Sequence, residues 1–235
     1  MGEGIRTFDC EGRSTREINI FLQEAAGRGM DSEVVLMNPD SRHNLAVGLT
    51  SPLAIRIEGH VGYYCAGLCE GVNVQVQGGA GWGLGENLMQ GRVQITGSAG
   101  SAAGATMRGG TIIVGGDAGA RCGVAMKGGT LVVGGDVGYM TGFMMQKGVM
   151  IVGGNAGEAL GDSLYEGRIY IRGTIDALGS DAIQADLTES DITLLSEALA
   201  DAGIDMIPAD FKKIVSGKKL YNFDKKEKEI WKTAL

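Results

Sequence analysis

Apolar residues recur every 19 positions along the middle of the chain. One series consists of Ile55, Val74, Val93, Ile112, Leu131, Met150 and Ile169, and a second of Ile57, Val76, Ile95, Val114, Val133, Val152 and Ile171. The two series lie two residues apart, so on a β-strand both sets of side chains point to the same side. The pattern predicts one short strand in each unit, with its apolar face turned toward the interior.

Glycines recur with the same period and separate the predicted strands. The glycines that follow the strands are Gly59, Gly78, Gly97, Gly116, Gly135, Gly154 and Gly173. We expect them to occupy tight turns that require positive φ. Three further series of the same period begin at Gly62, Gly85 and Gly91. Self-similarity at one short period is typical of a solenoid, in which each unit buries its apolar face against its neighbours.

A unit of 19 residues is too short for a pair of helices or a four-stranded blade. It suffices for one coil of a parallel β-helix. The sequence therefore predicts an all-β core over residues 52–180, a single-stranded right-handed parallel β-helix of about seven 19-residue coils, with short α-helical N- and C-terminal caps. At roughly 4.8 Å per coil the rod is about 30 Å long. A left-handed β-helix of the acyltransferase type is a weaker alternative, because hexapeptide repeats give about 18 residues a coil.

Two further periodic series mark the corners of the coils. Met107, Met126 and Met145 are expected to lie inside one corner, since methionine fills irregular gaps. The position after the first turn glycine is occupied by His60, Gly79, Ser98, Asp117, Asp136, Asn155 and Thr174. Most of these residues are small and polar and are typical of turns, where they cap backbone groups. We therefore interpret His60 as a turn residue rather than as a catalytic base.

The N-terminal part of the chain, residues 1–51, is predicted to form a cap. We expect an edge strand within residues 1–12, then a helix that begins at the capping box of Ser14 and Glu17. A strand, Val34–Met37, follows. Such a cap would cover the open edge of the first coil.

The C-terminal part, residues 181–235, is predicted to be helical with a charged tail. Thr188 and Asp191 are typical of a second capping box, and the helix that follows them is expected to end near Gly203. Another helix is expected over residues 208–217, because it begins with a proline, carries three apolar residues and ends at a glycine.

The outward-facing strand positions change from polar to apolar along the rod. They are Arg56, Gln75 and Gln94 in the early coils and Ile113, Val132, Ile151 and Tyr170 in the late ones. Four stacked apolar side chains would form an exposed patch unless something covers them. Either the chain's own C-terminal helix or a partner subunit is expected to do so, and we select these four as candidate interface residues. His43, in a polar loop, and Trp231, in the charged tail, complete the candidate interface.

Charge and composition narrow the class of function. The 235 residues carry a formal net charge of −7, so neither a nucleic acid nor an anionic membrane is expected as a partner. No apolar run approaches the roughly 20 residues that span a bilayer, and the N-terminus lacks the hydrophobic region of a signal peptide. The four cysteines are irregularly spaced and are expected to be buried and reduced, as in a cytoplasmic protein.

No catalytic, cofactor-binding or metal-binding residue is predicted in this chain. Cys65 and Cys69 lack a second pair of metal ligands, so a zinc site is poorly supported. Gly115–Gly119 is similar to a calcium-binding nonapeptide, but its aspartate does not recur in every coil. The chain begins Met1-Gly2, without the N-terminal cysteine nucleophile of a class II glutaminase. The residues alone indicate a scaffold or interaction rod.

Segments between and beyond the glycines carry a resemblance to a known family. They are Asn44–Gly48, Ile57–Tyr64, Ala120–Gly123, Gly157–Tyr165 and Lys219–Phe223. With the glycine repeats, over residues 14–223, they resemble the C-terminal β-helix (GXGXG) domain of the glutamate synthase large subunit in its stand-alone form. The resemblance implies two partners that carry the chemistry, a glutaminase-like subunit of class II amidotransferase type and an FMN-binding glutamate-synthase-like subunit. The β-helix would hold them in register for ammonia channelling.

The resemblance also implies a reaction. The first hypothesis is a cytoplasmic, hetero-oligomeric N-methylglutamate synthase, which makes N-methylglutamate and ammonia from methylamine and glutamate. The alternatives are a glutamate synthase that uses glutamine and 2-oxoglutarate, and a scaffold similar to the glycine-rich β-helix polypeptide of formylmethanofuran dehydrogenase. FMN, with an iron–sulfur cluster as a further candidate, is expected in the partner subunit and no cofactor in this chain. No catalytic residue of the family maps onto this sequence.

Overall fold

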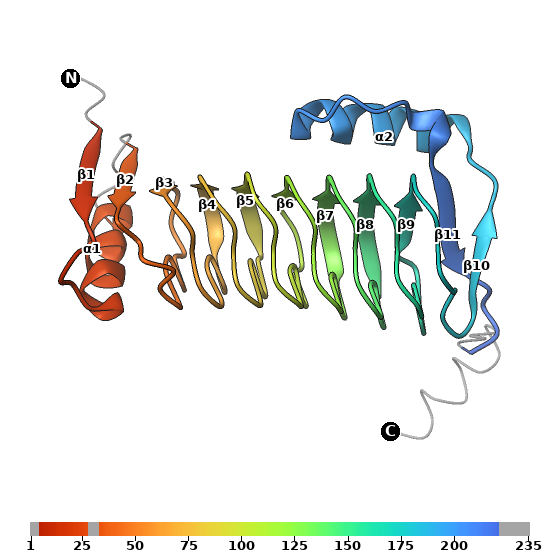
Figure 1. The fold of residues 1–235 in the computed structure, drawn as a ribbon, viewed down its shortest axis with the longest axis horizontal. Coiled ribbons are helices and arrows are strands. Elements are labelled where there is room, and N and C mark those ends of the chain that lie inside the picture. Colours follow the sequence, from red (N-terminus) through yellow and green to blue (C-terminus); the bar gives the residue numbers. More distant parts are fainter. Residues whose placement is uncertain (1–4, 28–32, 221–235) are drawn as a thin grey trace, which may run out of the picture.

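The computed structural model describes residues 5–27 and 33–220, and it is a rod of stacked coils (Figure 1). Each coil contributes one strand to a sheet that runs along the rod. The strands of the coils are β3 (Leu53–Glu58), β4 (Glu70–Val76), β5 (Gln90–Ile95), β6 (Thr111–Val114), β7 (Lys127–Val133), β8 (Lys147–Val152) and β9 (Arg168–Ile171). Neighbouring strands pair in parallel, with Ile55 beside Val74 and Val74 beside Val93. The prediction of a parallel β-helix of about seven 19-residue coils is confirmed.

The interior of the rod is filled by the apolar series predicted from the sequence. Every member of both strand series is buried, with at most 1% of its surface exposed. Met107, Met126 and Met145 are fully buried as well, as expected. All four cysteines are buried and free of disulfide bonds, as expected. The coils are therefore packed solid rather than hollow along their axis.

The glycines that follow the strands allow close packing between coils rather than positive φ. Of that predicted series only Gly59 has a positive φ, 132°. A side-chain carbon at Gly154 would lie 2.6 Å from the carbonyl carbon of Gly135, in the preceding coil. Positive φ occurs instead in two other series, which are Gly85, Gly104, Gly123, Gly142 and Gly161, and Gly91, Gly110, Gly129 and Gly148. The predicted 19-residue period of these glycines is confirmed, but the prediction that they have positive φ is wrong for all of them except Gly59.

Polar side chains link consecutive coils along one corner. His60 Nδ1 accepts a hydrogen bond from the backbone N–H of Gly79, at 2.8 Å. The contact recurs at Ser98, Asp117, Asp136 and Asn155, each of which accepts from the backbone N–H one coil further on. These acceptors satisfy backbone donors outside the sheet. The interpretation of this position as a turn cap is confirmed.

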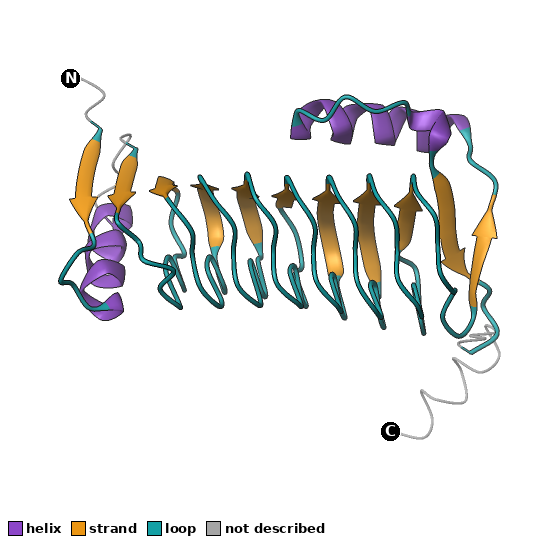
Figure 2. Ribbon diagram, viewed as in Figure 1, coloured by secondary structure: helices purple, strands orange, loops and turns teal. Residues whose placement is uncertain are grey.

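An N-terminal cap lies at one end of the rod (Figure 2). It consists of β1 (Arg6–Asp9), α1 (Thr15–Gly27) and β2 (Val34–Met37), and both strands extend the parallel sheet, with β1 at its edge. The predicted capping box is present. The Ser14 backbone N–H donates to Glu17 Oε2 at 2.8 Å, and the Glu17 backbone N–H donates to Ser14 Oγ at 3.3 Å.

The C-terminal segment returns along the outside of the coils (Figure 1). It comprises β10 (Ala182–Ala185), α2 (Glu189–Ala202), the 3-10 helix η1 (Pro208–Asp210) and β11 (Lys212–Ser216). Helix α2 begins at the predicted capping box of Thr188 and Asp191 and ends at Gly203, which has a φ of 69°.

The prediction of a second C-terminal helix over residues 208–217 is wrong beyond its first turn. The chain forms β11 there, which pairs antiparallel with β9 on one side and β10 on the other. The last coil would otherwise present unpaired backbone groups, and pairing with them stabilises a strand. Ile214 and Val215 are β-branched and suit a strand, whereas three apolar residues in so short a segment do not separate a strand from a helix.

Candidate interaction surfaces

The apolar stripe on the outside of the late coils is covered by the chain itself. Its members, Ile113, Val132, Ile151 and Tyr170, are each at most 2% exposed. They pack with Leu195 and Leu199 of α2 in an apolar cluster outside the coils. The sequence left open whether the C-terminal helix or a partner subunit covers the stripe, and in the structure the helix covers it. The selection of these four residues as a partner interface is therefore corrected, since α2 occupies the stripe.

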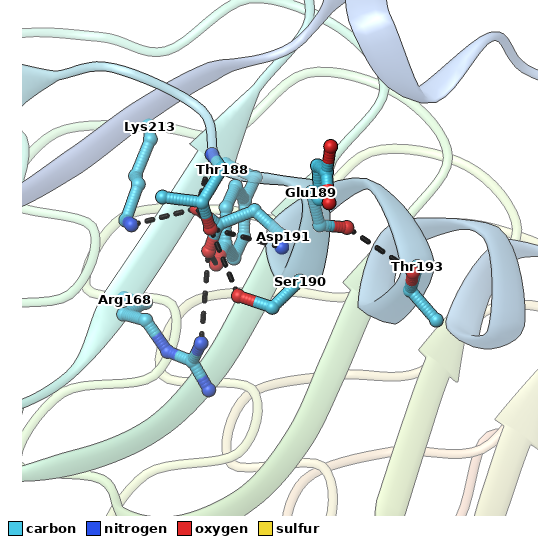
Figure 3. A network of polar contacts seen from close by, with 8 residues as sticks. Arg168, Thr188, Glu189, Ser190, Asp191, Thr193 and Lys213 are labelled. Carbon is cyan, nitrogen blue, oxygen red and sulfur yellow. Dashed lines mark hydrogen bonds and ion pairs between the residues drawn. The ribbon is translucent and has the colours of Figure 1, made fainter.

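Asp191, at the start of α2, anchors that helix to the rod (Figure 3). Its carboxylate is 1% exposed. Oδ1 accepts a hydrogen bond from the Tyr170 hydroxyl at 2.6 Å, and Oδ2 accepts from Lys213 Nζ at 2.7 Å and from the backbone N–H of Thr188 at 2.8 Å. Arg168 Nη1 lies 3.7 Å from Oδ1. Both oxygens of this buried carboxylate therefore face donors of the chain itself.

The contacts of Asp191 change the acidity of the groups around it. Burial alone would raise the pKa of Asp191, but hydrogen bonds from Lys213, Tyr170 and Thr188 hold that pKa below its ordinary value. Burial, and next the hydrogen bond to Asp191, raise the pKa of the Tyr170 hydroxyl. The carboxylate thus stays charged and the phenol neutral at neutral pH. A group so strongly held as an anion is a poor proton acceptor, so we assign the cluster a structural role.

Several exposed apolar side chains lie on two early coils. Tyr63, Tyr64, Leu68 and Trp82, here called the aromatic surface, are 41%, 47%, 58% and 56% exposed. Their sequence positions place them in the turns, away from the strands that α2 covers. Contiguous exposed apolar groups mark interaction sites, and Tyr and Trp are enriched at the centres of protein interfaces.

Three rings form a stack along the rod at this surface. The ring centroids of His43 and Tyr63 are 4.4 Å apart, and those of Tyr63 and Trp82 are 5.4 Å apart. The rings have room because the next coil carries a glycine beneath each of them. A side-chain carbon at Gly81 would lie 2.5 Å from Tyr63 Cδ1, and one at Gly100 would lie 2.5 Å from Trp82 Cδ1.

The stack places His43 next to the aromatic surface. The sequence had selected His43 for the candidate interface, but it had not identified the aromatic residues beside it. Its side chain is exposed, and Nδ1 accepts a hydrogen bond from the backbone N–H of Tyr63 at 2.8 Å. That bond fixes the ring in the stack. The contact of His43 with a partner stays a prediction. Trp231, the other terminal candidate, lies outside the described residues.

A small cavity opens beside the aromatic surface. The cavity, here called the Tyr64 pocket, has a volume of about 170 Å³ and is lined by Asn44, Val47, Tyr64, Gly67, Leu68, Glu86 and Asn87. Its walls combine a tyrosine ring, aliphatic groups, two side-chain amides and one carboxylate. Such a lining suits a side chain that is apolar along its stem and cationic at its tip.

Sequence reasoning missed the aromatic surface although its signal was present. Positions 63 and 82 are one period apart, and the same position later holds Ser101 and Ala120. A comparison of outward residues at the turns, of the kind made for the strands, would have found aromatic residues in two adjacent coils, and a third, Tyr139, three coils beyond Trp82. The side-by-side placement of Tyr64, Leu68 and Glu86 carries no such signal, because it depends on how the turn folds.

Larger cavities lie elsewhere in the described part of the chain, among them one of about 390 Å³ beside the end of α2, at Leu199 and Met206. Two others lie against the coils. One, of about 500 Å³, lies between residues 38–42 and the first coil and includes Glu58 and His60. The other, of about 540 Å³, is lined by Lys127, Lys147, Tyr165 and neighbouring residues. Within residues 5–27 and 33–220, no group of three or more histidine, cysteine, aspartate or glutamate side chains is placed to hold a metal ion. No helix in the same ranges is long and apolar enough to cross a membrane.

Comparison with known proteins shows a relative that is similar over most of the chain. Protein GlxC of Rhizobium meliloti (strain 1021) is 47% identical to this chain over 210 residues, which cover 89% of this chain and 92% of GlxC. No protein-family model matches the chain. The alignment includes the coils and part of both caps, because it leaves out only about a tenth of this chain, which is less than either cap.

Proposed function

The chain belongs to the family of GlxC, and from that premise we propose that it is the β-helix subunit of a glutamate-synthase-type enzyme, with the catalytic groups on partner subunits. Three lines of support bear on the proposal. The residues resemble the stand-alone β-helix domain of glutamate synthase, the fold is the parallel β-helix expected for that domain, and an aromatic surface is exposed on two early coils.

The observation that carries the proposal is that the polar side chains of the coils described above bind other groups of the same chain. The turn residues bind backbone N–H groups of the next coil, and the one buried carboxylate cluster in the described ranges anchors α2. The interior is filled by apolar side chains. Such a rod offers its outer surface for binding. An ammonia passage in the complex would run along that surface or through a partner, since the coil axis is packed.

For the reaction, we propose N-methylglutamate synthase, in which FMN and an iron–sulfur cluster belong to the FMN-binding partner. A class II amidotransferase-type subunit would be the other partner. In this arrangement the rod fixes the distance between two catalytic subunits. A glutamate synthase that uses glutamine and 2-oxoglutarate has the same architecture, so the assay must compare both reactions.

The test is native mass spectrometry of the tagged chain, purified from the cells in which it occurs. We expect the chain to be recovered with a glutaminase-like subunit and an FMN-containing subunit, and the complex to consume methylamine with glutamate. Turnover with glutamine and 2-oxoglutarate instead would select the glutamate synthase. Recovery of a lone rod, or of a partner that contains a metal–pterin cofactor, would overturn the proposal. So would glutamine hydrolysis or stoichiometric FMN binding by the chain alone.

A further inference from the structure

The Tyr64 pocket has the size and chemistry of a site for one side chain. We propose that it receives an arginine side chain from a partner subunit, while the aromatic surface packs against the segment that carries this arginine. The inference rests on the proposed function for the identity of the partner. The chemistry of the pocket stands on the contacts described next.

The pocket is smaller than the usual sites for metabolites and cofactors. Its volume is about 170 Å³. Sites for metabolites and cofactors have volumes of about 300–1,000 Å³. A single long side chain fits such a space, and the aliphatic groups of Val47 and Leu68 would contact its stem.

The positions of Tyr64 and Glu86 favour a guanidinium group at the tip of that side chain. Both lie close above Gly83, where a side-chain carbon would be 2.7 Å from Tyr64 Cδ1 and 3.2 Å from Glu86 Oε2. Within the described part of the chain, Glu86 is partly buried and takes part in no ion pair. A guanidinium stacks on an aromatic ring and pairs with a carboxylate through two N–H groups, whereas an ammonium is a compact, strongly hydrated charge.

The surroundings of the pocket indicate that the arginine comes from a protein. Leu68 lines the pocket, and Tyr63 and Trp82 lie in the same two turns as Tyr64 and Glu86. The side chains of Tyr63, Leu68 and Trp82 are 41%, 58% and 56% exposed. Large apolar and aromatic groups of this kind are buried at the centre of stable interfaces. The chain has a net charge of −7, so a partner surface that is basic around this arginine would also be attracted over a longer range.

The first experiment measures arginine recognition without any partner subunit. The probes are the capped peptides acetyl-Gly-Arg-Gly-amide and acetyl-Gly-Lys-Gly-amide, titrated into the ¹⁵N-labelled full-length chain. We expect the arginine peptide to shift the amide signals of Gly67 and Asn87. Glu86→Gln should weaken this binding about tenfold, which corresponds to about 1.4 kcal/mol. Equal shifts with the lysine peptide, or no shift at the pocket, would overturn the inference.

The second experiment tests the same pocket in the complex. The tagged chain is purified from its own cells as wild type, Glu86→Gln, Trp82→Ala and Tyr139→Ala. Tyr139 is a matched control, because it is 51% exposed at the same position of a coil three periods further on. We expect Glu86→Gln and Trp82→Ala to lose most of the partner and Tyr139→Ala to retain it. Circular dichroism of each variant checks that the coils are intact.

The outcomes separate the two proposals. If the wild type is recovered with the glutaminase-like and FMN subunits, and Glu86→Gln and Trp82→Ala are recovered with them equally well, the docking inference is wrong and the proposed function stands. If the arginine peptide binds at the pocket but the chain is recovered without those subunits, the proposed function is wrong and the arginine site stands. A homodimer that protects the pocket would identify a second copy as the occupant and overturn the inference.

Discussion

Glycines in this rod serve two different physical purposes that look alike in the sequence. At Gly123 the backbone has a φ of 65°, which an L-residue adopts only with strain. At Gly154 the backbone carries no such constraint, but the preceding coil leaves no space for a side-chain carbon. Both purposes recur with the period of the coils, because both follow from the stacking of similar turns.

Gly154→Ala should destabilise the protein although it causes no strain in φ. The new carbon would lie 2.6 Å from the carbonyl carbon and from the carbonyl oxygen of Gly135, so the two coils must separate locally. Overpacking of this kind costs about 1–3 kcal/mol. Urea-induced unfolding, followed by circular dichroism, measures the change in the free energy of unfolding.

Gly27→Ala is the matched control for this substitution. Gly27 ends α1, has an ordinary φ and has open space where the side chain would lie. We expect its free energy of unfolding to equal or slightly exceed that of the wild type, since alanine favours a helix. If Gly154→Ala left the stability as unchanged as this control, the close approach of the coils would not explain the glycine series.

At the scale of elements, α2 is held over the late coils at both of its ends. Asp191 anchors the first turn through Tyr170 and Lys213. At the other end, Arg92 Nη1 donates to Asp201 Oδ2 at 2.5 Å, and Arg92 Nη2 donates to the Asp201 carbonyl at 2.7 Å. Between these contacts the helix buries the apolar stripe. Polar groups therefore fix where the helix lies, while the stripe supplies its apolar contact.

The Asp191 anchor should make stability depend on pH in acid. The pKa of Asp191 is lowered in the folded protein, so its carboxylate stabilises the fold above the ordinary aspartate pKa of about 3.9. This contribution is lost as the pH falls below about 4, toward the lowered pKa. Asp191→Asn should cost about 1.5–3 kcal/mol at pH 7, the range for hydrogen bonds to charged groups.

The measurement is the free energy of unfolding of both proteins between pH 7 and about pH 3. The difference between wild type and Asp191→Asn should shrink as the pH is lowered, because only the wild type loses a charged anchor. Glu197→Gln, a change on the same helix at a side chain outside the anchor, is the control. A constant difference across the range would show that the charge of Asp191 does not stabilise α2.

Val132→Asp should release α2 and leave the coils folded. Val132 is 1% exposed beneath α2, where an unpaired carboxylate would be costly to bury. Its neighbours in the sequence, Leu131 and Val133, face the coil interior and stay buried. Hydrogen–deuterium exchange should therefore rise throughout residues 189–202 and change little in β4. Exchange that stays slow in α2 would contradict its dependence on the stripe.

At the scale of the whole molecule, the fold was predictable wherever the period of the sequence is the period of the structure. The strands, their register, the buried methionines and the corner contacts all recur once per coil, so one correct unit fixes the rest. β10 and β11 lie outside the repeat. Their pairing depends on the open edge that β9 leaves, which a local pattern over residues 208–217 does not contain.

The interaction surfaces were less predictable for the same reason. The stripe of Ile113, Val132, Ile151 and Tyr170 was found because it recurs, but its cover is a segment distant in sequence. The Tyr64 pocket depends on residues, such as Tyr64 and Glu86, that do not recur with the period of the coils. Turn residues that lie near one another in a single coil have no periodic signal, and their direction follows from backbone angles that the sequence pattern does not encode.

A rod of stacked coils should open from its ends, and its buried thiols can report this. Burial raises the pKa of Cys65 and of Cys122 to about 12, so both stay protonated and unreactive until a coil opens. Cys65 lies in the first coil and Cys122 in the fourth, and in a solenoid each unit is stabilised by its neighbours. A thiol reagent, with labelled sites identified by mass spectrometry, should therefore modify Cys65 faster than Cys122 in low urea.

In urea that unfolds the whole protein, the two rates of modification should become equal, which controls for intrinsic reactivity. Equal rates at every urea concentration would mean that the coils open as one cooperative unit, and the nearest-neighbour description would not apply to this rod.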